Sequence, residues 1–232
     1  MPLFGGGIVP RLEDLLGVPV LNLAKAGDEV RYMLGVEQRK LLDEQLSNGC
    51  PAGGSWDALL FSGGGNDIVA DPMALWIRDY DPARGGPAAQ IHQPRLDAAL
   101  ALVRAGYEDL VALRDARSPT TRLFFHGYDF ALADGRGICH LGPWLKPAYD
   151  LRGFPHLEAR VAVTKEMLRQ FGAMLDDLAS RHALVTVVRT QGVLPERPES
   201  WHNELHPSKA GYDQFARLFR DALKQAFPTR VL

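Results

Sequence analysis

The chain has 232 residues, of which 46% are hydrophobic and 23% charged, so it is long enough to bury the core of one α/β domain. Its 26 Lys and Arg residues against 28 Asp and Glu residues give a formal net charge of -2, without the basic excess that nucleic-acid or membrane-surface binding requires. No apolar run approaches the roughly 20 residues needed to cross a bilayer.

The N-terminal residues and the two cysteines indicate where in the cell the protein is expected. Residues 1–10 contain no basic region followed by an apolar stretch, so no signal peptide is predicted. Two cysteines, Cys50 and Cys139, cannot build a disulfide framework, and their surroundings do not have the spacing of a zinc site. We therefore expect a cytoplasmic protein that needs neither a metal ion nor another cofactor.

Four short apolar runs bounded by turn residues are predicted to be strands. They do not alternate apolar with polar residues, which favours a parallel sheet covered on both faces. In chain order the runs are Val18–Leu23, Ala58–Ser62, Arg122–His126 and Leu184–Val188.

Longer segments between and after these runs have apolar residues at three- and four-residue spacings, which predicts amphipathic helices. These segments are Glu29–Leu46, Pro94–Ala116, Leu157–His182 and Ser208–Phe227. Ser208 is a candidate N-cap for the last of them. Alternating strands and helices indicate right-handed βαβ units, and hence a three-layer α/β/α sandwich formed by a single domain over residues 1–232.

Two segments interrupt the alternation. Asp71–His92 is rich in Pro, Gly and Asp, and Gly127–Pro155 is a long segment rich in Gly, Pro and aromatic residues. Each leaves the carboxyl end of a predicted strand, where open α/β sheets bind ligands. Loops of this length are usually functional or disordered.

The first polar motif, Asn22–Asp28, follows the first predicted strand. Gly27 allows a tight turn and a close approach of the backbone to a ligand, and its N–H lies near the start of a helix, where an anion is favoured. The alternative is an ordinary strand-to-helix turn with Asp28 as the N-cap.

The second motif, Ser62–Asp67, follows the second predicted strand and contains three successive glycines. The glycines clear space above the end of the strand, and the Asn66 amide offers N–H groups to a developing oxyanion. A glycine-rich turn, with Asn66 and Asp67 bonding the local backbone, would explain the same residues.

The third motif, Trp201–Pro207, precedes the last helix. Asn203 lies three residues before His206, close enough for the two side chains to share a face. Pro207 favours an extended His206 and begins the helix behind it, which suits a general base. His202 is predicted to belong to a surface turn.

Together, the three motifs resemble the blocks of the SGNH (GDSL-type) hydrolase superfamily over nearly the whole chain. Gly27 matches its glycine block, the segment Gly64–Asp67 its Gly-x-Asn-Asp block, and the segment Asn203–Pro207 its Asp-x-x-His-Pro block. The middle segment from His126 to Pro147 resembles bacterial members.

This resemblance implies a flavodoxin-like α/β/α fold, a small-molecule ester substrate and no metal. It implies that the Gly27 N–H and the Asn66 amide form the oxyanion hole and that His206, oriented by Asn203, is the general base. It also suggests Gly65, Tyr128 and Asp129 as substrate contacts.

The chain departs from the family pattern at the nucleophile, because no Gly-Asp-Ser block is present and no Gly-x-Ser-x-Gly elbow replaces it. The segment Met1–Gly7 resembles the stretch that follows such a block, so we expect the first strand and its serine upstream of Met1. In the family that strand lies between the first two strands predicted here. A gap in the sheet is therefore expected at this place.

A second departure is Asn203, which stands where the family's Asp-x-x-His-Pro block has its aspartate. An amide holds the imidazole but cannot balance an imidazolium, and in serine proteases this exchange lowers turnover by about 10⁴-fold. Glu204 or a backbone carbonyl would be an alternative orienting group.

Two functions fit these motifs. The first is an esterase that works by serine attack, acyl-enzyme formation and hydrolysis. The second is a non-catalytic ligand-binding domain of the same fold, which the Asn203 exchange would suit. The motifs do not distinguish carbohydrate O-acetyl esters from lipid or small acyl esters, and they do not indicate an oligomeric state.

Overall fold

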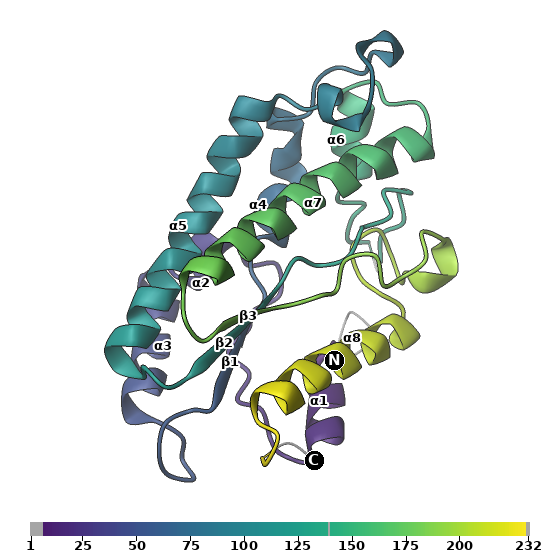
Figure 1. The fold of residues 1–232 in the computed structure, drawn as a ribbon. Coiled ribbons are helices and arrows are strands. Elements are labelled where there is room, and N and C mark those ends of the chain that lie inside the picture. The colour runs from purple at the N-terminus through teal and green to yellow at the C-terminus, as the bar shows by residue number, and fades with distance from the viewer. Residues whose placement is uncertain (1–6, 139, 231–232) are drawn as a thin grey trace.

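A computed structural model of the chain describes residues 7–138 and 140–230 (Figure 1). Its sheet is parallel and consists of strands β1 (Ala58–Phe61), β2 (Arg122–His126) and β3 (Val185–Val188), in the order β1-β2-β3. Leu60 lies opposite Phe124 in the first ladder. Three of the four predicted strands are therefore confirmed, each within one residue of its expected bounds.

The helices connect and cover these strands. In the described part of the chain they are α1 (Val9–Leu16), α2 (Val30–Met33), α3 (Val36–Asn48), α4 (Gly65–Ile68), α5 (Gln93–Arg117), α6 (Lys146–Leu151), α7 (Leu157–Arg181) and α8 (Lys209–Ala226). The predicted helices correspond closely to α5, α7 and α8. Ser208 caps α8 as expected, because its hydroxyl accepts a hydrogen bond from the Gly211 N–H at 3.2 Å.

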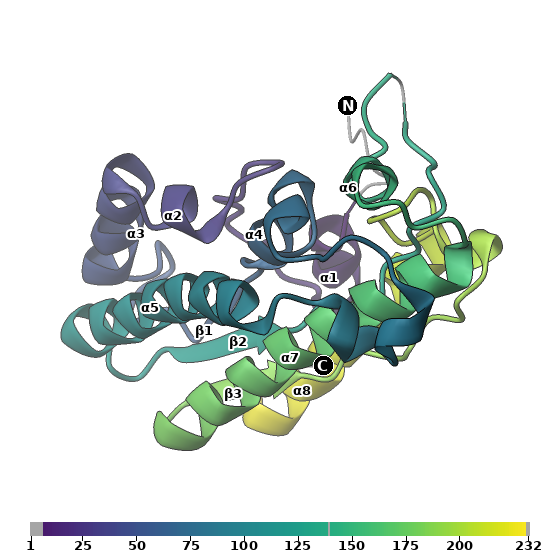
Figure 2. The same ribbon diagram turned by 90° about the horizontal axis from the view of Figure 1, so that it is seen from above.

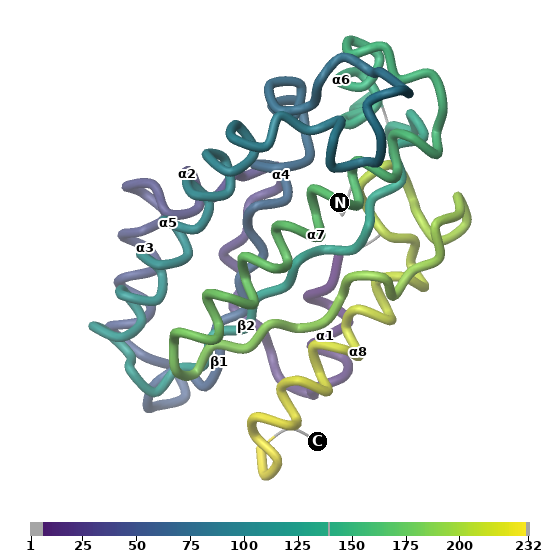
Figure 3. The backbone as a smooth tube through the Cα atoms, turned by 45° about the horizontal axis from the view of Figure 1, so that its top comes forward, coloured from purple at the N-terminus to yellow at the C-terminus, as the bar shows by residue number. Residues whose placement is uncertain are grey.

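Alternating side chains of β2 separate two apolar layers. Leu123 and Phe125 pack into the larger core with α5 and α7, whereas Phe124 packs against residues of α1 and α8 on the opposite face. Figures 1 and 3 show α5 and α7 on one side of the sheet and α1 and α8 on the other. This arrangement confirms the α/β/α layering.

The prediction of a strand at Val18–Leu23 is wrong. The segment has no strand structure, and the side chains of Val18 and Leu21 are 52% and 49% exposed. A strand forms only where a neighbour supplies partners for its N–H and C=O groups. Within the described ranges β1 pairs with β2 alone, and no ladder joins β1 to residues 18–23.

The predicted helix Glu29–Leu46 is divided into α2 and α3. Gly35 adopts an extended conformation with ψ 169°, and its backbone lies so close to the Arg31 carbonyl that a Cβ atom there would be 2.9 Å from the oxygen. The apolar spacing continues across this break, so periodicity alone did not reveal it.

Candidate active site

In the glycine-rich segment after β1, the backbone lies close to aromatic side chains. Gly64 has a φ of 95°, and a Cβ atom there would lie 2.7 Å from the Phe171 ring. A Cβ atom at Gly65 would lie 2.8 Å from the Tyr128 ring. The side chain of Tyr107 holds this turn by donating a hydrogen bond to the Gly63 carbonyl at 2.8 Å. Glycine is therefore required here by packing and by backbone conformation.

The structure joins the first two motifs. Asn66 Nδ2 donates a hydrogen bond to the Asp28 carbonyl at 3.1 Å, and both carboxylate oxygens of Asp67 accept from the Val30 N–H at 3.2 and 3.0 Å. Gly27 immediately precedes the bonded Asp28, is exposed and has a φ of 84°. These contacts connect the Gly27 turn to the end of β1, although residues 18–23 are not a strand.

His206 is held by Asn203. Asn203 Oδ1 accepts hydrogen bonds from the backbone N–H groups of Leu205 and His206, at 3.0 and 2.9 Å, and lies 2.9 Å from His206 Nδ1. Because this oxygen can only accept, His206 Nδ1 carries the proton and Nε2 carries the lone pair in the neutral ring. This is the tautomer that a general base requires.

Glu204 does not orient His206 directly. Its side chain is fully buried, and its carboxylate accepts hydrogen bonds from four backbone N–H groups at 2.6 to 3.0 Å, those of Gly135, Trp144, Leu145 and Lys146. The carboxylate therefore fastens the segment after β2 to the His206 turn. Of Asn203 and Glu204, Asn203 is the residue whose side chain contacts the His206 ring.

Ser62 lies in a separate polar cluster at the ends of β1 and β2. The Tyr128 N–H donates to His126 Nδ1 at 3.2 Å, so His126 carries its proton on Nε2, which lies 2.8 Å from Ser62 Oγ. Burial lowers the pKa of His126 to about 4. His126 is therefore a donor to Ser62 and cannot take its proton, and this pair lacks the arrangement of a nucleophile and its base.

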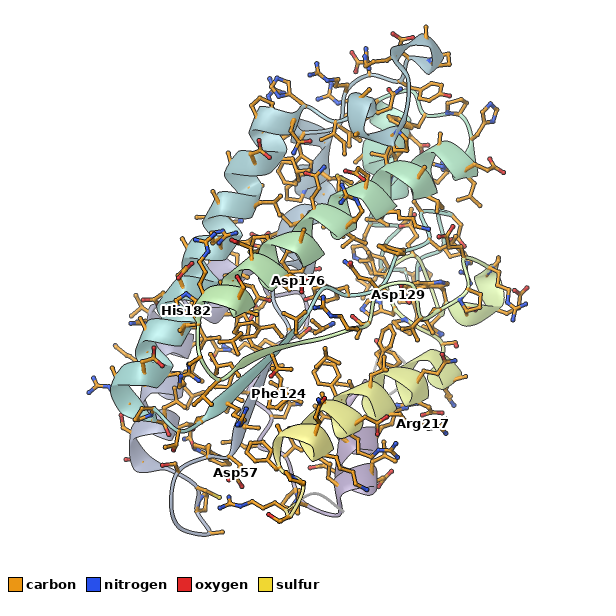
Figure 4. The ribbon with its side chains drawn as sticks, viewed as in Figure 1. Asp57, Phe124, Asp129, Asp176, His182 and Arg217 are labelled. Carbon is orange, nitrogen blue, oxygen red and sulfur yellow. The ribbon has the colours of Figure 1, made fainter. Side chains whose placement is uncertain are left out.

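Asp129, a predicted substrate contact, connects two loops through its side chain. The buried carboxylate accepts hydrogen bonds from the backbone N–H groups of Phe130, Gly192 and Leu194 at 2.6 to 2.7 Å. It thereby connects the loops that follow β2 and β3. Figure 4 shows Asp129 and Asp57 at opposite ends of the sheet, with Phe124 between them.

The predicted residues thus form two groups, one linked to the segment after β1 and one in the segment between β3 and α8. Gly27, Gly65 and Asn66 belong to the group after β1, and Asn203 and His206 to the group after β3. His202 is exposed, as predicted for a surface turn. Sequence reasoning missed the role of Glu204 in the loop, since its partners are backbone groups some 60 residues away that have no sequence signature.

Comparisons with known proteins identify the family of the chain. The model of the GDSL-like lipase/acylhydrolase family matches residues 4–214, well over half of the chain. The chain belongs to this family. Comparison with curated proteins gives no match.

The GDSL-like chain also matches solved structures at low sequence identity. A Streptococcus pneumonia protein assigned as a platelet activating factor is 17% identical with a TM-score of 0.59, and the match covers 93% of this chain and 79% of that one. The lipase Lip_vut3 from goat rumen metagenome is 18% identical with a TM-score of 0.57, covering 93% and 87%. A protein of Agrobacterium tumefaciens assigned as an arylesterase is 16% identical with a TM-score of 0.53, covering 98% and 89%. These similarities support the fold.

The described part of the GDSL-like chain has neither a candidate metal site nor a membrane-spanning helix. Among residues 7–138 and 140–230, no group of three or more His, Cys, Asp and Glu side chains is placed to hold a metal ion. In the same ranges, no helix is both long enough and apolar enough to span a bilayer. Cys139 and most of the segment Met1–Gly7 lie outside the described residues.

The exchange of Asn203 for an acid predicts a shift in the basicity of His206 in this GDSL-like chain. Burial, and secondarily the charge of His202, lowers the pKa of His206 to about 4. Asn203→Asp would place a carboxylate beside Nδ1, favour the imidazolium and raise that pKa by about 1 to 3 pH units. An NMR titration of the His206 ring proton measures the change, and an unaltered pKa would contradict the 2.9 Å contact.

The same pKa predicts how stability depends on pH. Because the folded-state pKa of about 4 is below the unfolded value near 6.5, protonation of His206 opposes folding. The folded chain therefore has its full stability, as far as His206 is concerned, above about pH 6.5, and it loses stability as the pH falls towards 4. Asn203→Asp should reduce this loss, which urea unfolding at a series of pH values would detect.

Proposed function

We propose that this chain is an SGNH-type ester hydrolase in a single domain over residues 1–232, with its serine nucleophile supplied by a segment that precedes Met1. The observation that carries the proposal is the hydrogen bond from His206 Nδ1 to Asn203 Oδ1, which leaves the lone pair on Nε2. The low pKa of His206, about 4, keeps the ring neutral near pH 7. The family match supports a small-molecule ester as the substrate class.

In the proposed reaction, His206 Nε2 takes the proton of the serine hydroxyl while the serine oxygen attacks the ester carbonyl. The Gly27 N–H and the second N–H of the Asn66 amide stabilise the oxyanion, since Asp28 uses only one of the two amide hydrogens. The protonated His206 then gives its proton to the departing alkoxide, which leaves as an alcohol. Water, deprotonated by His206, releases the acid from the acyl-enzyme.

Two features support an external serine. Ser62 donates to Tyr128 Oη at 3.3 Å and is matched with a histidine that can only donate to it. Among the described residues β1 pairs with β2 alone, and residues 18–23 form no strand, with the Val18 and Leu21 side chains about half exposed. A strand placed between them would cover these side chains and pair with β1.

The alternative function is a ligand-binding domain without turnover. It is favoured by Asn203, whose buried Nδ2 has no hydrogen-bond partner among the described residues and whose amide cannot balance a charge on His206. A binding domain would have no need for such a charge. The two functions differ in whether an acyl-enzyme forms.

The test compares the chain from Met1 with a form extended by the genomic sequence upstream, once circular dichroism and a cooperative melt show that both are folded. We expect fluorophosphonate labelling and p-nitrophenyl acetate hydrolysis only in the extended form. Activity of the Met1 chain that depends on His206 would overturn the external serine. An extended form without labelling or turnover would favour the binding domain.

Asn66→Ala in the active form is expected to lower turnover by roughly 10² to 10³-fold, because it removes an oxyanion donor. The KM for a short ester should change little. Asn48→Ala, which alters an exposed amide at the end of α3, is the matched control and should keep full activity. Equal rates for the two variants would show that Asn66 does not donate to the oxyanion.

A further inference from the structure

The indole of Trp144 packs against the proposed general base. Its ring centroid lies 5.9 Å from that of His206, and the two planes meet edge to face at 77°. Trp144 is half-buried and belongs to neither apolar layer of the sheet. A large aromatic side chain thus stands beside the proposed catalytic imidazole without serving as a core residue.

The position of Trp144 is determined by its backbone. Its N–H donates to Glu204 Oε2 at 2.6 Å, and the next N–H, of Leu145, donates to the same oxygen at 2.8 Å. The indole also lies against Gly142, where a Cβ atom would be 2.7 Å from the ring and where φ is 79°. These contacts leave the indole little freedom, so a ligand would meet a preformed surface.

The segment just before Trp144 also presents apolar surface. Ile138 and Leu141 pair through two backbone hydrogen bonds of 2.7 and 2.8 Å, and the side chain of Leu141 is 48% exposed. Figure 2 shows the described part of the segment that leads into α6, in teal-green, beside this helix. The carboxylate of Glu204, two residues before His206, is buried under backbone donors.

We propose that Trp144 forms the wall of a subsite for the alcohol part of the ester, and that this subsite selects apolar alcohols, either alkyl chains or aromatic rings. The inference rests on the proposed function. A general base returns its proton to the leaving oxygen, so the carbon group on that oxygen must pass beside His206. There it meets the indole, and an apolar group gains by covering it.

Binding of product alcohols tests the subsite in the Met1 chain itself, because binding needs no serine. We expect 1-hexanol to shift the His206 ring signal and to change indole fluorescence, with a dissociation constant about tenfold higher in Trp144→Ala and within about threefold in Trp144→Phe. Methanol should not distinguish the variants.

The fluorescence change should disappear in Trp144→Phe and persist in Trp56→Phe, which alters an indole at the amino end of β1. Equal hexanol affinity in the wild-type chain and a folded Trp144→Ala would overturn the subsite.

A second measurement uses the active, extended form. Trp144→Ala should lower the ratio of kcat/KM for hexyl acetate to that for methyl acetate by about tenfold, and leave the ratio of methyl hexanoate to methyl acetate unchanged. A residue that only shields or positions His206 would lower all three rates together, and that result would contradict the proposal. If the extended form did not hydrolyse esters but still bound hexanol through Trp144, the proposed reaction would be refuted while the apolar binding site would stand.

Discussion

Replacing His206 with alanine is expected to lower ester hydrolysis by about 10⁴ to 10⁶-fold in the form that carries the serine. Without the imidazole no group takes the serine proton or protonates the departing alkoxide. Residual turnover would come from the oxyanion donors and from substrate binding. Release of p-nitrophenol from p-nitrophenyl acetate measures the loss.

The control for this variant is His156→Ala, which removes an exposed imidazole that does not cap the start of α7. It should retain the wild-type rate. Fluorophosphonate labelling should also slow in His206→Ala, since the probe reacts with a serine activated by the base. If His206→Ala retained more than about a tenth of the turnover, another group would be the base and the role given to Asn203 would be wrong.

Replacing Glu204 with alanine is expected to destabilise the folded chain by about 3–5 kcal/mol, or roughly 6–20 °C in Tm for a domain of this size. The carboxylate is fully buried, and its removal leaves four backbone N–H groups without an acceptor. Each such buried donor is costly. Thermal and urea unfolding measure the change.

The matched control is Glu196→Ala, because Glu196 forms an ion pair with Lys165 at 2.5 Å on the surface, where such pairs contribute at most about 1 kcal/mol. Hydrogen exchange gives a local readout. The amides of Trp144, Leu145 and Lys146 should lose protection in Glu204→Ala and keep it in Glu196→Ala. Unchanged protection of these amides would mean that Glu204 does not hold the loop.

The elements that could be predicted from the sequence are those whose signal is local. α5, α7 and α8 repeat their apolar residues at helical spacing, and the cores of β1, β2 and β3 are short apolar runs between turn residues. The motifs around Gly27, Asn66 and His206 were also recognisable, because each is a contiguous segment with a family pattern. The Asn203 to His206 contact follows from a spacing of three residues within one turn.

The elements that could not be predicted depend on partners far away in the chain. Val18–Leu23 has the composition of a strand, but a strand exists only when a neighbour accepts its hydrogen bonds, and none is present beside it in the described residues. The pairing of Ser62 with His126 likewise joins residues 64 positions apart. Only the tertiary structure shows that this histidine donates to the serine.

By itself, the sequence of this protein determined the fold class, the family and the identity of the candidate site residues, since periodicity and short motifs are local properties. The tertiary structure alone decided how those residues are used. In the structure, Asn203 contacts the His206 ring, and Glu204 accepts hydrogen bonds from backbone N–H groups such as that of Trp144. The Trp144 indole packs beside the imidazole. Hydrogen-bond acceptance and ring packing depend on which distant groups meet, and chain folding settles that.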